Sequence, residues 1–172
     1  MARILSGTDF ISYFRRLKDK DTTDAARLRF ETESTISEEM EVNSTVTKEG
    51  VKSVVSNGEN TADFSSLAYS NDTDTIEAWK ELRTWFRQKE EVEFWNVNRA
   101  TLTDTNQVDV DYHTGLFTSF EMSLPADGEA TLSYSYIINE MAEGVDTLDQ
   151  SQLEELSDEI AYQTMKATGA GV

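Results

Sequence analysis

The sequence predicts a mainly β (α+β) domain with a single helix packed on its flank. Three observations lead to this prediction. Apolar and polar residues alternate along residues 28–36 and 129–139, which is the period of a strand with one buried face. Residues 73–89 instead repeat apolar side chains at helical spacing. Residues 37–60 are polar, with too little apolar material to bury themselves.

The predicted helix over residues 73–89 has a start signal. Asp74 can cap it, and Glu77 three residues later completes a capping-box pattern. The apolar stripe that follows consists of Ile76, Trp79, Leu82 and Phe86. We expect this stripe to be buried against a sheet, because residues 91–98 and most of the remaining chain have strand character.

Strands are predicted at residues 10–17, 28–36, 61–69, 91–98, 108–124 and 129–139, with 108–124 forming either one long strand or two strands broken at Gly115. The turn Pro125-Ala-Asp-Gly128 joins the last two as a hairpin. By simple alternation, Leu116, Phe120, Met122 and Leu124 share an apolar face of their segment. Phe117 then falls on the opposite face, with the polar residues.

The polar sides of these strands form a candidate functional surface. Each predicted member lies opposite the main apolar residues of its strand. The members are Glu31, Glu33, Ser119, Glu121, Ser123, Thr131 and Ser133. The alternative interpretation is an ordinary solvated sheet face.

Residues 37–60 are predicted to form a hairpin arm. Two short strand-like pieces, 44–47 and 51–56, flank Lys48-Glu49-Gly50. We expect the arm to pack on an adjacent subunit or ring, with contacts from Glu41, Val46, Lys48, Val51, Lys52 and Val54. The arm belongs to a predicted domain over residues 1–150. Residues 151–172 form a predicted C-terminal arm, and residues 151–165 have the pattern of a second helix.

Charge is spread unevenly along the chain. The net charge is −18, yet residues 1–30 carry +3, and no Lys or Arg lies between Arg99 and Lys166. Such an acidic surface repels nucleic acid and anionic membranes, and solubility alone is the alternative explanation of the charge. A mildly basic start and an acidic remainder would attract each other between neighbouring copies, as in a head-to-tail contact. No apolar run reaches membrane-spanning length, so we expect no membrane partner.

The sequence offers little catalytic or metal-binding chemistry. It has no Cys and one His. Asp109, Asp111 and His113 alternate along a predicted strand, but zinc sites usually need further His or Cys ligands, so a solvated strand edge is the favoured interpretation. We therefore expect no enzymatic activity, no metal and no cofactor.

With this order of elements, the chain resembles the major tail protein family, the tail-tube subunits of bacteriophages with long, non-contractile tails (siphophages). The opening Ser6-Gly-Thr-Asp-Phe-Ile-Ser-Tyr-Phe14 is similar to the family's first strand. Glu31-Thr-Glu-Ser-Thr-Ile-Ser-Glu38 precedes a long polar arm. Val92-Glu-Phe-Trp-Asn-Val97 follows the helix. Residues 112–138 resemble its closing hairpin, and Asp146-Thr-Leu148 opens what looks like its C-terminal arm.

The resemblance implies an antiparallel β-sandwich whose strands join across subunits into a barrel, with the helix outside. It implies sixfold rings stacked into a tube in the virion tail, assembled in the host cytoplasm. The tube would house a tape-measure protein, end at tail terminator and distal tail proteins, and conduct DNA into the host without specific binding. The seven polar residues named above would then line the channel. A different class, an acidic DNA mimic that inhibits a DNA-binding enzyme, is supported by charge alone.

Overall fold

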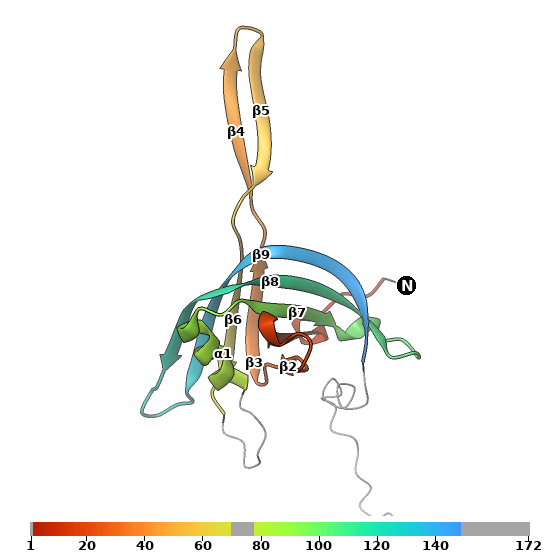
Figure 1. Ribbon diagram of the computed structural model, residues 1–172, viewed down its shortest axis with the longest axis vertical. Helices are drawn as coiled ribbons and strands as arrows, with labels where there is room; N and C mark the ends of the chain where they lie inside the picture. The colour runs from red at the N-terminus through yellow and green to blue at the C-terminus, as the bar shows by residue number, and fades with distance from the viewer. Residues whose placement is uncertain (1, 70–77, 149–172) are drawn as a thin grey trace, which may run out of the picture.

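The computed structural model describes residues 2–69 and 78–148, and these form one curled antiparallel sheet with a projecting hairpin and a helix (Figure 1). The sheet has seven strands in the order β2-β1-β7-β8-β9-β6-β3. Its strands are β1 (Phe10–Arg16), β2 (Ala26–Arg27), β3 (Glu31–Ser37), β6 (Asn60–Leu67), β7 (Val92–Asn98), β8 (Gln107–Ser123) and β9 (Thr131–Thr147). Three short 3₁₀ turns, η1 (Gly7–Asp9), η2 (Leu17–Asp19) and η3 (Arg99–Thr101), adjoin β1 and β7.

The sheet curls until its two ends approach each other. The backbone N–H of Leu28 donates to the carbonyl of Ser12 on β1 at 3.1 Å, just before the chain enters the edge strand β3. Across the interior, the rings of Phe14 on β1 and Phe64 on β6 lie 5.1 Å apart and edge to face. The two layers expected of a sandwich are therefore supplied by one sheet that folds over its own aromatic core.

The helix α1 (Ala78–Gln88) covers the apolar side of this sheet. Leu82 and Trp79 are buried, at 2% and 8% exposure, and Phe86 is partly buried against the same cluster. The Trp79 indole N–H also donates to the Tyr69 carbonyl at 2.8 Å. The predicted burial is confirmed for Trp79 and Leu82, whereas Phe86 is only partly buried. Ile76, together with the predicted cap, lies outside the described residues.

Two apolar clusters share the sheet. The larger one contains Phe14, Phe64, Phe94, Phe117, Leu132, Tyr134, Tyr136 and the buried residues of α1. The smaller one contains Ile11, Tyr13, Val97, Val108, Val110 and Leu148. Strand β1 contributes to both, because Phe14 and Tyr13 are consecutive and point to opposite faces.

Two irregularities in the pairing of β8 with β9 change the face that the sequence predicts for residues of β8. The register against β9 shifts between Thr114 and Gly115 and again between Phe117 and Ser119. An extra residue in one strand reverses the alternation from that point on. Phe117 therefore lies in the core, 7% exposed, instead of sharing the face of Ser119. The expected placement of Phe117 was wrong for this reason, and Leu124 is exposed beyond the end of the strand.

The predicted arm is a regular hairpin that projects away from the body (Figure 1). Its strands, β4 (Met40–Thr47) and β5 (Gly50–Asn57), pair along their whole length and are longer than the two short pieces expected. At its root, the Gly58 N–H donates to the Glu39 carbonyl at 2.9 Å, and a Cβ on Gly58 would come within 2.7 Å of that oxygen. The predicted C-terminal arm, 151–172, lies outside the described residues.

Candidate functional site

A polar face runs across four neighbouring strands on the side opposite the aromatic core. Directly paired residues on adjacent strands share a face, so the register defines its rows. One row crosses β3, β6, β9 and β8 at Glu33, Ser65, Ser133 and Glu121. The next consists of Thr35, Asp63, Ser135 and Ser119, and Thr131 pairs with Ser123 beyond the first row. Six of the seven predicted residues are thus brought onto one surface.

This polar face is built from short hydroxyl side chains with isolated acids among them. Glu33, Asp63 and Glu121 are exposed, and the Ser135 hydroxyl donates to the Asp63 carboxylate at 2.7 Å. Glu33 and Glu121 lie in the same row but are separated by two strands, about 14 Å at the usual strand spacing. Serines between them avoid a direct like-charge pair, which would destabilise the sheet. Asp63 was missed by sequence reasoning, although its alternation with Ala62 and Phe64 carries the needed signal.

Glu31 is placed differently from the other predicted members of the polar face. The register between β3 and β6 shifts between Glu31 and Glu33, so Glu31 pairs with the buried Ser66 while Glu33 pairs with Ser65. Its carboxylate turns toward β1 and accepts a hydrogen bond from the Ser12 hydroxyl at 2.9 Å. Burial raises the pKa of Glu31 to about 7, against the opposing effects of the Ser12 hydrogen bond and the Arg27 charge. We therefore leave Glu31 out of the polar face.

A cleft of about 730 Å³ lies where the curled sheet does not close, between the start of β1 and the edge strand β3. It is lined by residues of both sides, including Phe10, Arg27, Phe30, Glu31 and Arg99. Phe30 has a positive φ of 55° and is 58% exposed, which breaks the alternation that the sequence shows between Leu28 and Ile36. In the part of the chain that the structure describes, β3 pairs only with β6, so its other side is a sheet edge beside this cleft.

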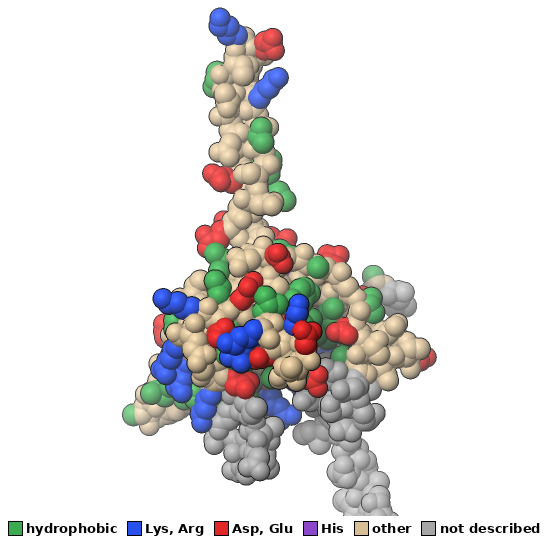
Figure 2. Space-filling view, viewed as in Figure 1, with side chains coloured by type: hydrophobic (Ala, Val, Ile, Leu, Met, Phe, Trp, Pro, Cys, Tyr) green, Lys and Arg blue, Asp and Glu red, His purple; other side chains and the backbone are tan. Residues whose placement is uncertain are grey.

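The hairpin arm carries all six of its predicted contact residues on exposed positions. The register places Val46 opposite Val51 on one face, and Glu41, Lys52 and Val54 belong to the other. Lys48 lies in the turn between the two strands. Figure 2 shows hydrophobic side chains exposed along the arm and basic ones near its tip.

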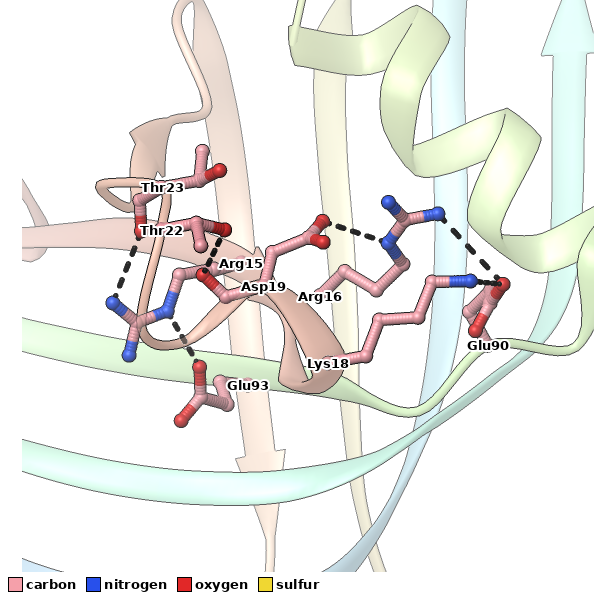
Figure 3. A network of polar contacts seen from close by, with 8 residues as sticks. All are labelled: Arg15, Arg16, Lys18, Asp19, Thr22, Thr23, Glu90 and Glu93. Carbon is pink, nitrogen blue, oxygen red and sulfur yellow. Dashed lines mark hydrogen bonds and ion pairs between the residues drawn. The ribbon is translucent and has the colours of Figure 1, made fainter.

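Three basic residues near the start of the chain form ion pairs with acids of the same chain (Figure 3). Arg15 contacts Glu93 at 2.7 Å, and Arg16 contacts Asp19 at 2.7 Å and Glu90 at 3.7 Å. Lys18 also pairs with Glu90. This internal neutralisation weakens the charge attraction between copies that the uneven distribution along the sequence predicts.

The single histidine belongs to the core and not to a metal centre. His113 is 1% exposed, its ring stacks on Phe94 with centroids 4.8 Å apart, and its Nδ1 lies 3.3 Å from the Phe94 carbonyl oxygen. Burial lowers its pKa. Among residues 2–69 and 78–148, no group of three or more His, Asp or Glu side chains is placed to hold a metal ion. The favoured interpretation, a solvated strand edge, was wrong for His113 because stacking and burial hold its ring.

Comparison with known proteins identifies the chain's relatives. A family model described as phage tail tube protein matches residues 4–141. The chain belongs to the phage tail tube protein family. Its members are structural proteins of virion tails, and so is this one. A search of curated protein sequences returns no match.

Solved structures share the fold of this tail tube protein at low identity. The SPP1 tail tube, solved by solid-state NMR and cryo-EM, is 15% identical with a TM-score of 0.75, covering 98% of this chain and 95% of that one. The tail of an empty gene transfer agent particle, refined with C6 symmetry, is 15% identical with a TM-score of 0.57, covering 84% and 100%. The sheath–tube complex of an extracellular contractile injection system is 10% identical with a TM-score of 0.54, covering 84% and 93%.

In the part of the chain that the structure covers, no helix is long and apolar enough to cross a membrane.

Proposed function

We propose that the subunit assembles into hexameric rings that stack into the tail tube, with the polar face of β3, β6, β9 and β8 lining the channel. The observation that carries this proposal is the division of one sheet into two unlike sides. Over β3, β6, β9 and the end of β8, the apolar side is covered by the aromatic core and α1, whereas the opposite side carries two rows of Ser, Thr and three exposed acids. The inner wall of a tube needs a polar side of this kind, because it must stay hydrated without binding the molecules that pass through the channel.

The channel would house a tape-measure protein during assembly and later conduct DNA. Glu33, Asp63 and Glu121 repel phosphates only at short range, because salt screens their field within about 8 Å. Lysines at these positions would instead bind phosphates by releasing counterions. An acidic wall therefore leaves a central path open. Its task requires no catalysis, and we propose that the protein is not an enzyme.

Contacts outside the channel complete the proposed assembly. The hairpin arm packs on an adjacent subunit, and the open edge of β3 pairs with a neighbouring copy, which would remove an unprotected sheet edge. Tail terminator and distal tail proteins would close the two ends of the tube. The alternative of a monomeric DNA mimic gives no role to the projecting arm.

Electron microscopy of the purified protein at rising concentration tests the proposal. We expect rings or stacked tubes with sixfold end views. Small particles at every concentration, with circular dichroism showing a folded β protein, would contradict self-assembly and favour the mimic.

A further inference from the structure

The two faces of the hairpin arm differ in chemistry. In the β4–β5 register, opposite residues share a face. One face, here called the apolar arm face, is made of Met40, Val42, Val46, Val51 and Val55, with Ser44 and Ser53 between them. Those two hydroxyls bond each other at 2.8 Å, so they need no outside partner. The other face presents Glu41, Asn43, Thr45, Lys52, Val54 and Ser56.

The apolar arm face is exposed to an unusual degree. Its five large side chains are 57–81% exposed. Eight-residue strands extend about 26 Å at 3.3 Å per residue, and the arm points away from the body (Figure 1). The subunit's own sheet is therefore not placed to cover this face. An isolated two-stranded hairpin is only marginally stable in water, so a partner that buries one face would also stabilise the arm.

We infer that the apolar arm face, and not the opposite face, docks on a second copy of this chain; this inference rests on the proposed function. The distribution of charge favours a second copy of this chain as the partner of the arm. Within the hairpin itself, residues 40–57, Lys48 and Lys52 balance Glu41 and Glu49, whereas the remainder of the chain carries the whole net charge of −18. The arm can approach an acidic copy without the repulsion that two bodies would experience.

A second copy also offers apolar area of its own. Leu102, Leu124, Met141 and Val145 are 41–71% exposed on the body. In a head-to-tail assembly every subunit supplies one arm and one acceptor, so each arm face is buried in the same way. The polar arm face, with Lys52, then remains toward solvent.

Two matched cysteine variants test this inference in a chain that has no Cys. Val46→Cys places a thiol on the apolar arm face, and Val54→Cys places one on the opposite face. The parent residues are 81% and 65% exposed in the subunit. Thiol reactivity follows access, so assembly into tubes should slow maleimide labelling of the Val46→Cys variant by about tenfold or more and change the Val54→Cys variant by less than about threefold. Equal protection of both thiols, or none at Val46→Cys, would overturn the inference.

Charged substitutions give a second readout. Val42→Asp with Val55→Asp should abolish tubes, while Val54→Asp, which introduces the same residue type into the same hairpin, should leave them intact. Circular dichroism of the dispersed protein controls for folding. A Val54→Asp variant that assembles as poorly as the double variant would also overturn the inference. If the wild-type protein itself forms no tubes, the proposed function fails; if it forms tubes with a reactive thiol at Val46→Cys, only the choice of face fails.

Discussion

The side-chain hydroxyl of Ser12 donates a hydrogen bond to the carboxylate of Glu31, with 2.9 Å between the two oxygens. This contact joins β1 to the edge strand β3 across the place where the curled sheet does not close. The carboxylate is largely withdrawn from water there, and burial raises its pKa to about 7. The contact that holds β1 and β3 together is thereby linked to proton binding by Glu31.

The first prediction is a pH dependence of folding that Glu31 causes. The folded chain keeps this proton up to a pKa of about 7, whereas the unfolded chain releases it near the ordinary 4.5. Between these values the folded state holds more protons, so its stability must fall as pH rises. Glu31→Gln should abolish this slope and raise the free energy of unfolding at pH 8 by up to about 3 kcal/mol.

Urea unfolding of wild type and variant at pH 5 and pH 8 measures the difference. The variant must be compared with the wild type because burial also lowers the pKa of His113. Below the ordinary pKa of histidine, that shift makes stability rise with pH, which opposes the effect of Glu31. Glu33→Gln, on the exposed polar face, is the control and should track the wild type. If Glu31→Gln also tracks the wild type at both pH values, the carboxyl is not desolvated.

The second prediction concerns the helix contact. Trp79→Ala should lower the free energy of unfolding by about 3–5 kcal/mol, because it removes a large buried side chain and leaves a cavity. It also removes the donor to the Tyr69 carbonyl. Gln88→Ala, on an exposed position of α1, should have little effect. Thermal melts followed by circular dichroism check both, and an unchanged melting temperature for Trp79→Ala would mean that the helix contributes little to the core.

The third prediction uses a close backbone approach. A Cβ on Gly115 would lie 1.8 Å from the carbonyl oxygen of Ile137, whereas a Cβ on Gly144 would meet nothing within 4 Å. Gly115→Ala must push β8 and β9 apart at the bulge, and it should destabilise the fold by about 1–3 kcal/mol or more. Gly144→Ala should be close to neutral. Chemical denaturation measures the pair; similar values for the two variants would contradict the approach of these strands.

The fourth prediction concerns the channel. Glu33→Lys, Asp63→Lys and Glu121→Lys combined should still permit tubes, because the side chains are exposed, but DNA delivery should slow and become more sensitive to salt. Asp21→Lys, Asp24→Lys and Asp104→Lys change the net charge equally in exposed loops and serve as the control. Delivery from assembled virions is timed across a salt series. Equal delivery by the two triple variants would place the polar face elsewhere in the tube.

The fifth prediction concerns the arm as a whole. Deleting residues 41–57 and bridging them with a short Gly linker removes β4 and β5 and leaves the body, whose sheet does not include these strands. We expect a folded subunit that no longer assembles. Circular dichroism and electron microscopy test the two halves of this statement separately, and an unfolded product would assign the arm to the folding core.

Much of this architecture follows from local pattern. The alternation in residues 129–139, the stripe through Trp79 and Leu82, and the polar composition of the arm each report a feature that the local sequence alone determines. The faces of Glu31 and Phe117 do not follow from it, because each depends on a bulge. A bulge is fixed by how two distant strands pair, and one extra residue reverses every later assignment.

The same distinction explains the missed and misassigned residues. The alternation of Asp63 with Ala62 and Phe64 places it opposite the core, but its position within the polar face follows only from the register of β6 with its two neighbours. The two faces of the arm become apparent only when Val42 is aligned with Val55, since neither strand alone shows an apolar stripe of this width. His113 looked like a solvated residue because the stacking partner, Phe94, lies on another strand.

Strand β1 contributes to both apolar clusters, and this affects how the subunit unfolds. Phe14 anchors one cluster and Tyr13 the other, and β8 repeats the arrangement with Phe117 and Val110. Neither cluster can be dismantled without pulling away a strand that the other requires. Neither part of the body should therefore unfold before the other, and thermal unfolding should occur in a single cooperative step.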